Sequence, residues 1–334
     1  MNSLRTRLVV SASLVGLLAA ACSSPISDSV TSDADLVAVT TVSPITNLVA
    51  NIACDRALVL GLVPEGVNSH TFEPSPTHAA TLADASVVFV NGLNLELPTM
   101  QLAESNVADG VEIVSLGDAA ITPDEYIYDF SFPEDGGDPN PHLWTNPLHA
   151  LDYAETIAST LTELDPEGAD LYAQQLALVT ERLEAMDVAV REATETVPEQ
   201  SRRLLTYHDS FPYFAREYGW KVVGAIQPSD FAEPSPREVA DLIDQIRAEQ
   251  VPAIFGSEVF ESPVLERIAE ETGAQYVAEL RDDDLPGDPG DANHSYFGLM
   301  VFDFTTMVDA LGGDSSALAD LPTDNLCGEA VYDS

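Results

Sequence analysis

Three of the six histidines in this 334-residue chain lie beside short polar or proline-containing turns. They are His70 in "VNSHTFEPSP", His142 in "DPNPHLW" and His208 in "LLTYHDSF". Neutral imidazoles bind divalent first-row metals, and three imidazoles with one carboxylate complete a four-coordinate site. The acidic residues 282–284, in "ELRDDDLPG", can supply the carboxylate. The residue types therefore predict a metal site, provided that the fold brings these segments together.

The chain shows twice the alternation of strand-like and helical segments that is typical of α/β proteins. In the first half, apolar and β-branched runs occupy residues 35–41, 57–63, 86–92 and 111–117. In the second half, similar runs occupy residues 202–208, 221–227, 251–257 and 274–280. Near-continuous apolar strands separated by helices predict parallel sheets that are covered on both faces. We therefore expect two α/β lobes, each a mainly four-stranded parallel sheet flanked by helices.

Each candidate metal-binding segment comes at or after the end of a predicted strand. His70 follows the second strand of the first half, and His142 follows the fourth. His208 ends the first strand of the second half, and residues 282–284 follow the last. Ligands of open parallel sheets bind beyond the carboxyl ends of the strands. All four segments can therefore face one cleft between the lobes.

One long helix is predicted between the two halves. Asp165 can cap it, and Pro166 suits its first position. About 28 residues at ~1.5 Å each make a rod on the order of 42 Å, which is longer than an ordinary surface helix requires. We therefore expect a rigid spine over residues 165–197 that joins a first lobe, residues 35–164, to a second lobe, residues 198–334.

The N-terminal residues have the features of an export signal. Arg5 and Arg7 precede an apolar run that is short for a membrane span, and small residues then lead to Cys22. The segment "LAAAC" resembles a bacterial lipoprotein processing site; an ordinary cleaved signal with an incidental cysteine is the alternative. We expect a signal peptide over residues 1–21, a lipid on Cys22 at the outer face of the cytoplasmic membrane, and a flexible tether over residues 22–34.

The other two cysteines, Cys54 and Cys327, form an even pair in a chain that we expect to be exported. Outside the cytoplasm such a pair is expected to be oxidised. A disulfide would tie the first predicted helix to the C-terminal tail. Two free buried thiols are the alternative, because a sequence does not show which residues are close in space.

Acidic residues outnumber basic ones by 56 to 13, and Lys221 is the only lysine. Such a surface repels nucleic acid and offers no polybasic patch to anionic lipid, so neither is expected as a partner. The acidic residues are spread through predicted helices and loops. They fit a solvated surface, or alternatively a field that enriches cations, but they do not locate a site.

Five short segments make the prediction more specific, because they occur together and in one order. They are "GVNSHTFEPSP", "NGLNLE", "DPNPHLW", "TYHDSFPYFAREYG" and "IFGSEVF". Through them, residues 35–312 resemble the metal-binding solute-binding proteins of zinc and manganese ABC importers. The resemblance implies two lobes joined by a rigid helix, with one metal held between them. It also implies delivery of that metal to a permease in the cytoplasmic membrane without catalysis, and we expect a monomer.

The resemblance also implies roles for individual residues. His70, His142 and His208 match the family's three nitrogen ligands. The fourth ligand is implied to be Asp283, because Leu285 then takes the apolar place two residues on, with Asp282 as the alternative. This chain departs from the family in "DPNPHLW", where the usual pattern is "DPH" followed by an aromatic residue. That difference leaves the path of the loop open.

Other polar residues near these motifs are weaker candidates. His78 and His149 are expected on exposed helix starts, whereas His294 follows the acidic loop and is an alternate ligand. Glu258 and Glu73 can orient a ligand by a hydrogen bond without touching the metal. An ordinary structural hydrogen bond explains both glutamates equally well.

Two other functions compete with metal transport. A metal-dependent hydrolase would need an open coordination position and a general base, and the chain has neither an HExxH nor a G-x-S-x-G motif. A metal-binding adhesin lipoprotein would not need ligands at four strand ends. Three imidazoles favour zinc, whereas manganese prefers more oxygen ligands. Manganese is the alternative, because the resemblance implies that relatives with the same ligand set can carry it. Residues 121–138 are acidic without histidine, so we expect a mobile solvated loop whose carboxylates at most collect cations weakly.

Overall fold

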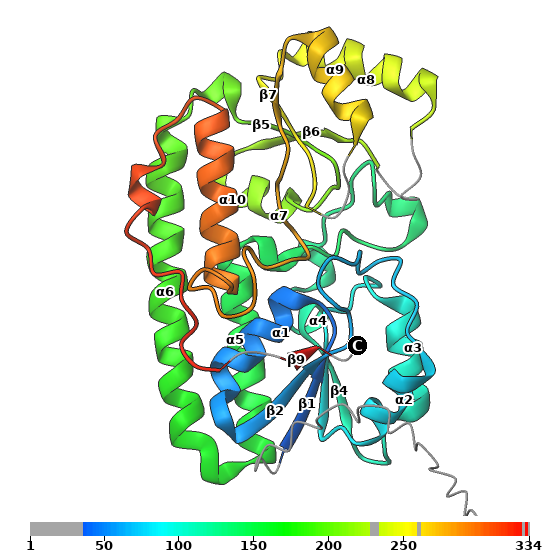
Figure 1. Ribbon diagram of the computed structural model, residues 1–334, viewed down its shortest axis with the longest axis vertical. Coiled ribbons are helices and arrows are strands. Elements are labelled where there is room, and N and C mark those ends of the chain that lie inside the picture. Colours follow the sequence, from blue (N-terminus) through cyan, green and yellow to red (C-terminus); the bar gives the residue numbers. More distant parts are fainter. Residues whose placement is uncertain (1–35, 228–233, 259–261, 329–330, 333–334) are drawn as a thin grey trace, which may run out of the picture. The chain divides into compact units, whose positions relative to one another are not determined.

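The computed structural model describes residues 36–227, 234–258, 262–328 and 331–332. The predicted signal peptide, Cys22 and the tether lie outside these residues. Within them, two parallel sheets and the helices that cover them form the predicted α/β architecture (Figure 1). None of the described helices is both long and apolar enough to cross a membrane.

The first sheet has five parallel strands in the order β4-β3-β1-β2-β9. These strands are β1 Leu36–Thr40, β2 Ala57–Gly61, β3 Val87–Val90, β4 Glu112–Ser115 and β9 Val331–Tyr332. The helices of this lobe are α1 Ser43–Ala53, α2 Pro76–Ala83, α3 Leu97–Asn106, α4 Leu116–Ala120 and α5 Pro147–Leu164. Neighbouring strand residues face opposite sides, so Ala38 packs with α1 and α5 while Val39 packs with α2 and α3. Because both faces are buried, the central strands β1, β2 and β3 are almost entirely apolar, whereas the edge strand β4 begins with the exposed Glu112.

The second sheet has the four predicted strands, in the order β6-β5-β7-β8. They are β5 Arg203–Thr206, β6 Lys221–Ala225, β7 Ala253–Phe255 and β8 Gln275–Val277. The helices of this lobe are α7 Pro212–Tyr218, α8 Pro236–Glu249, α9 Pro263–Thr272 and α10 Tyr296–Ala310. Leu205 belongs to the core that contains α8 and α9, whereas Leu204 belongs to the core that contains α7 and α10. This sheet is therefore also covered on both faces.

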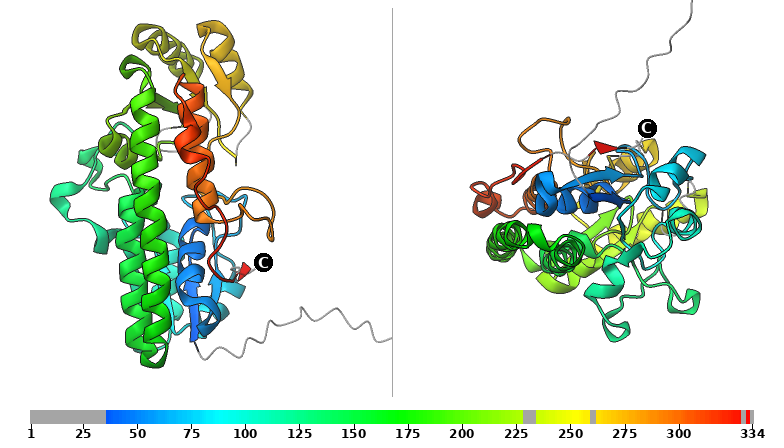
Figure 2. Two further views of the ribbon diagram at one scale, coloured as in Figure 1. Left: turned by 90° about the vertical axis from the view of Figure 1, so that its left-hand side faces the viewer. Right: turned by 90° about the horizontal axis from the view of Figure 1, so that it is seen from below.

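The predicted spine is a helix of 28 residues, α6 (Ala169–Thr196), which is ~42 Å long at ~1.5 Å per residue. It begins later than predicted, because Pro166–Gly168 forms a 3-10 turn. The Asp165 carboxylate accepts hydrogen bonds from Arg56 and from the hydroxyl of Tyr172 instead of capping the helix. The short turn folds α5 back along α6, so the spine helix is braced by an antiparallel partner (Figure 2).

The C-terminal tail returns to the first sheet, which corrects the prediction that residues 198–334 all belong to the second lobe. β9 is the fifth strand of the first sheet, with Leu60 opposite Val331 and Gly61 opposite Tyr332. A strand of two residues carries no periodic signal, so the pattern of the sequence did not reveal it.

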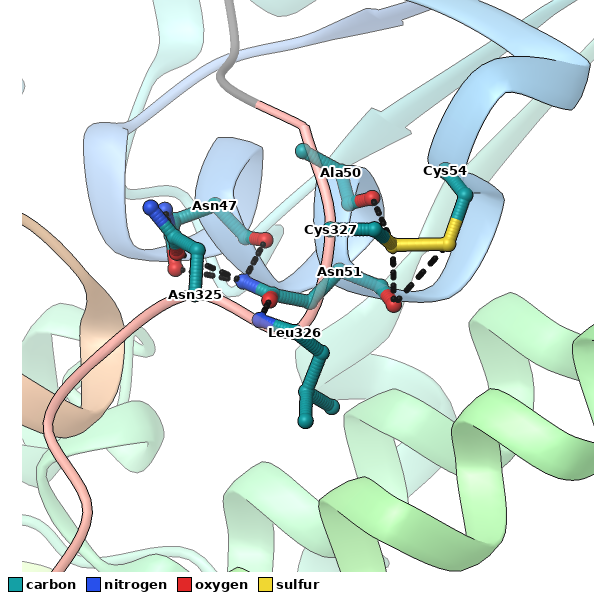
Figure 3. Close-up of a disulfide and its surroundings, with 7 residues drawn as sticks. All are labelled: Asn47, Ala50, Asn51, Cys54, Asn325, Leu326 and Cys327. Carbon is teal, nitrogen blue, oxygen red and sulfur yellow. Dashed lines mark hydrogen bonds between the residues drawn. A yellow bond between two sulfur atoms is a disulfide. The ribbon is translucent and has the colours of Figure 1, made fainter. Parts of the chain in front are cut away.

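The predicted disulfide joins Cys54 to Cys327, whose Cα atoms are 5.3 Å apart (Figure 3). Close to it, the Asn325 side-chain oxygen accepts hydrogen bonds from the side-chain amides of Asn47 and Asn51 on α1. The tail is therefore attached to α1 by a covalent bond and by hydrogen bonds, although 273 residues separate the two cysteines in the sequence.

Candidate metal centre

The structure brings the three predicted histidines together. One ring nitrogen each of His70, His142 and His208 lies within 4.8 Å of the other two, and no other trio of His, Cys, Asp or Glu in the described part of the chain is so close. The Nε2 atoms of His70 and His142 are 3.0 Å apart. His142 and His208 are buried, and His70 is half-buried. Three imidazoles at this spacing can surround one metal ion.

The loop after β2 holds His70. Asn68 accepts hydrogen bonds at its side-chain oxygen from the backbone N–H groups of His70 and Thr71, at 3.0 and 3.1 Å. Asparagine commonly folds a turn in this way, because its short side chain reaches the backbone two or three residues on. The turn sets the direction in which His70 leaves the loop.

Asn140 orients His142. The Asn140 side-chain NH₂ donates to the backbone oxygen of Asp209 and to the carboxylate of Asp129, so its Oδ1 is the atom that faces the imidazole. This Oδ1 lies 2.8 Å from His142 Nδ1 and accepts its proton. His142 therefore presents Nε2, its unprotonated nitrogen, to the other two histidines.

Asp282 orients His208. The His208 Nδ1 lies 2.6 Å from the Asp282 carboxylate, and both side chains are buried. A carboxylate on one ring nitrogen is the usual device that orients a metal-binding imidazole and increases its basicity. Asp282, the alternative fourth ligand, is thus engaged with a histidine.

Asp283 reaches the loop that carries His70. Its carboxylate accepts hydrogen bonds from the backbone N–H and the hydroxyl of Ser69, each at 3.0 Å. Neither Asp282 nor Asp283 is within 4.8 Å of all three histidine nitrogens. Burial, and then the charge of Asp282, raise the pKa of Asp283 to about 7. Asp283 therefore lies next to the histidine group without joining it.

The remaining candidates lie apart from the three histidines. His294 pairs with Glu65, with 3.2 Å between His294 Nε2 and the Glu65 carboxylate. His149 pairs with Asp152 on α5. His78 was expected to be exposed, but it is buried. Its Nδ1 accepts a hydrogen bond from the backbone N–H of Ser75 in a capping box at the start of α2.

The two candidate glutamates differ from each other. Glu73 is exposed. Glu258 accepts hydrogen bonds at one carboxylate oxygen from the backbone N–H groups of Asp282, Asp283 and Asp284. Burial, and then the charge of Asp282, raise the pKa of Glu258 well above its ordinary value. Glu258 thus holds the backbone of residues 282–284 by hydrogen bonds.

Burial and neighbouring charges divide the histidines into two kinds. Burial, together with the nearby His208, lowers the pKa of both His70 and His142 well below the ordinary value. Burial also lowers the pKa of His208, but the charges of Asp282 and its acidic neighbours outweigh burial, and the net pKa is raised. His70 and His142 are therefore neutral at neutral pH and ready to bind a cation.

The loop over residues 121–138 was expected in solvent, but part of it lies against the histidine group. The Phe132 ring centroid is 6.2 Å from that of His70 and 6.0 Å from that of His142. Nearby, Asp209 is buried, and burial, followed by the charge of Asp129, raises its pKa to about 8. This loop therefore covers one side of the histidine group with an aromatic ring.

Several residues that hold the site were not singled out from the sequence. They are Asn68, Ser69, Asn140 and Asp209, the last through its backbone oxygen, which accepts a hydrogen bond from Asn140. Each is a small polar residue within two positions of a histidine, and that proximity is the one signal that could have identified them. Trp144 is a further case, because its indole N–H donates to the backbone oxygen of Asp282 and so joins the His142 loop to the acidic loop.

Residues 38–310 match the family described as zinc-uptake complex component A, periplasmic. The chain belongs to this family. The match confirms the resemblance to metal-binding solute-binding proteins, and it supports a binding protein rather than an enzyme. The family match covers the segments that carry all three histidines and the acidic loop.

Individual relatives are named for different metals. The iron-binding protein YfeA of Yersinia pestis is 30% identical over 274 residues, which cover 82% of this chain and 86% of that protein. The manganese ABC transporter substrate-binding lipoprotein PsaA of Streptococcus pneumoniae is 27% identical and covers 89% of this chain and 95% of its own length. The solved structure of the periplasmic zinc binding protein TroA of Treponema pallidum aligns with a TM-score of 0.75 at 25% identity, over 83% of this chain and 99% of that one.

Proposed function

We propose that this protein captures a divalent metal ion outside the cytoplasm and delivers it to the membrane permease of an ABC importer. The observation that carries the proposal is the group formed by His70, His142 and His208, whose ring nitrogens lie within 4.8 Å of one another. His70 follows β2 of the first sheet and His208 follows β5 of the second, whereas His142 lies between α4 and α5. Membership of a metal-uptake family supports transport of the ion without chemistry.

In this proposal the three histidines are the nitrogen ligands and Asp283 is the fourth ligand. A carboxylate has about four lone-pair sites, so Asp283 can keep its hydrogen bonds from Ser69 and still bind a cation. Asp282 serves the site by orienting His208. The position of Asp283 beside Ser69, the neighbour of His70, supports this assignment over Asp282.

We propose zinc as the preferred metal and manganese as the alternative. Three nitrogens and one oxygen form the tetrahedral set that zinc favours, whereas manganese favours a larger number of oxygen ligands. The relatives named for iron, manganese and zinc have similar folds or sequences, so the donor set of this chain is the argument for zinc.

We further propose that the protein is a monomer held at the outer face of the cytoplasmic membrane by a lipid on Cys22. The name of PsaA includes the word lipoprotein, which supports the anchor. Incorporation of labelled palmitate into the wild-type protein and its loss in Cys22→Ser would test the anchor.

The deciding experiment is a competition of zinc and manganese for metal-stripped protein, followed by calorimetry and by mass spectrometry of the retained ion. We expect one metal per chain, with zinc bound more tightly than manganese. Tighter binding of manganese would reject the zinc preference but not the site. Absence of stoichiometric binding of either ion would reject the proposed function.

A further inference from the structure

Glu258 makes an unusual set of contacts behind the loop that carries Asp283. Its Oε1 accepts hydrogen bonds from three consecutive backbone N–H groups, those of Asp282, Asp283 and Asp284, at 3.0, 3.2 and 3.3 Å. Successive N–H groups that converge on one point form a concave site for an anion. Here a side chain of the same protein fills that concavity.

The side chains of the same three aspartates reach three different partners. Asp282 pairs with His208 Nδ1 at 2.6 Å, and Asp283 accepts hydrogen bonds from Ser69 at 3.0 Å. Asp284 accepts the backbone N–H of Gly66 at 2.6 Å. The loop backbone therefore surrounds one Glu258 oxygen, while its side chains extend to a histidine of the site and to the loop before His70.

This arrangement has an electrostatic cost. Four carboxyl groups lie together in a buried region, and like charges at short range disfavour one another. Without Glu258, however, three backbone N–H groups of a mostly buried loop would lose their acceptor, and unpaired buried donors are also costly. A side-chain oxygen at this point is thus what keeps the loop in its present path.

We propose that Glu258 is a positioning residue for the metal site, whose carboxylate oxygen fixes the backbone of residues 282–284. Through that backbone it places Asp283 beside the three histidines and Asp282 on His208. The inference rests on the proposed function, because it concerns the same site. It adds a residue that does not touch the metal and that comes from a different loop, between β7 and α9.

The test uses variants that separate hydrogen-bond acceptance from charge. Glu258→Gln keeps an acceptor oxygen at the same reach without the charge, whereas Glu258→Asp keeps the charge but shortens the side chain by one methylene. Glu258→Ala removes both, and Glu270→Ala on the exposed side of α9 is the matched control for loss of a glutamate. Zinc affinity is measured by chelator competition, and amide hydrogen exchange is followed over residues 280–286.

We expect Glu258→Ala to weaken zinc binding by about 10- to 100-fold, the usual effect of losing a residue that orients a ligand. Glu258→Gln should bind within a few-fold of wild type, and Glu258→Asp should bind more weakly than Gln. Exchange over residues 280–286 should accelerate in Ala and Asp but not in Gln. If Glu258→Ala does not fold, the comparison of Gln with Asp still decides the question.

Two results would overturn the inference. One is wild-type affinity in Glu258→Ala while Asp283→Asn and His142→Ala lose affinity, which would leave the proposed function intact. The other is a loss of zinc affinity in Glu258→Gln while Glu258→Asp binds like wild type, because charge and not hydrogen-bond acceptance would then govern the site. Failure of the wild-type protein to bind metal would instead reject the proposed function.

Discussion

His208 and Asp282 form a buried pair across two loops of the second lobe, with 2.6 Å between His208 Nδ1 and an Asp282 carboxylate oxygen. His208 follows β5 and Asp282 follows β8, and β7 lies between these two strands in the sheet. Because of this pair, the two neighbouring aspartates of the acidic loop have different partners. One aspartate orients a histidine, and its neighbour Asp283 is left to face the loop of His70.

This division predicts unequal effects of two similar substitutions. Asp283→Asn should weaken metal binding more than Asp282→Asn, because the first removes a proposed ligand and the second removes a group that orients one. Losing an orienting partner typically reduces metal affinity by about 10- to 100-fold. Both variants are compared by chelator competition with zinc. The reverse order of effects would move the fourth ligand to Asp282.

The histidines predict a second contrast. Alanine at position 70, 142 or 208 should weaken zinc binding far more than His149→Ala, because His149 pairs with Asp152 on α5 outside the histidine group. His149→Ala is a better control than His78→Ala, since His78 is buried in the capping box of α2 and its loss should lower stability. Calorimetric titration of each variant measures the effect. An equal loss in His149→Ala and His142→Ala would show that His142 is misassigned.

Metal affinity should fall as pH drops from about 7 to 5, across the ordinary titration range of histidine. The net pKa of His208 is raised, because its acidic neighbours outweigh the effect of burial, so a metal must displace a proton from this ring. The pKa of Asp283 is also raised, to about 7, mainly by burial. Metal affinity is therefore lost as the pH falls through the pKa values of His208 and Asp283, because both groups then become protonated.

The same shifts predict the source of the protons that zinc releases. His70 and His142 have lowered pKa values, so at pH 7 both rings are already neutral and should release almost no protons when zinc binds. Calorimetry in buffers of different ionisation enthalpy counts the protons. Release should decrease in Asp283→Asn and persist in His149→Ala. A zinc affinity that does not change between about pH 7 and pH 5 would contradict a histidine-based site.

Removal of the disulfide should affect stability more than metal binding. Cys54 and Cys327 are 273 residues apart, and the chain-entropy model gives an upper bound of about 6 kcal/mol for closing such a long loop. A Cys54→Ser, Cys327→Ser double variant should unfold at a lower temperature, with β9 exchanging its amides faster. Zinc affinity should stay within a few-fold of wild type, because the bridge lies at the C-terminal end of α1 and not on a histidine loop. A large loss of affinity with unchanged stability would contradict this separation.

The braced spine helix predicts small motions on metal binding. α6 is a continuous helix of 28 residues and α5 is packed along part of it, so a large rotation of one lobe would have to bend a braced helix. We expect little change in the radius of gyration by small-angle scattering, but slower hydrogen exchange over residues 124–142 and 281–295 in the metal-loaded protein. These two segments carry His142 and Asp283. A large contraction in solution would argue against a rigid connection.

Much of the site was accessible from the sequence, because it depends on a general property of parallel sheets. The apolar runs that end before His70 and at His208 predict strands, and the carboxyl ends of parallel strands gather at one edge. Three histidines at such positions were therefore expected to meet, and they do. The cysteine pair was predictable in the same general sense, from its even number in an exported chain.

Other features depended on contacts between distant segments, which local patterns do not encode. β9 has two residues, and only its alignment with Leu60 and Gly61 makes it a strand. α5 was not expected to brace α6, because periodicity indicates an apolar face but not the helix that covers it. Glu258 had two equal interpretations in the sequence, and the convergence of three backbone N–H groups on its oxygen appears only when the loops after β7 and β8 lie together. The sequence by itself determined the strands and the histidines that follow them, because these follow from residue types at local spacing. The class of protein was implied by the resemblance of its motifs to a known family. Tertiary structure alone decided which aspartate meets which partner, because a hydrogen bond depends on distances of about 3 Å between atoms that the chain separates by up to 218 residues.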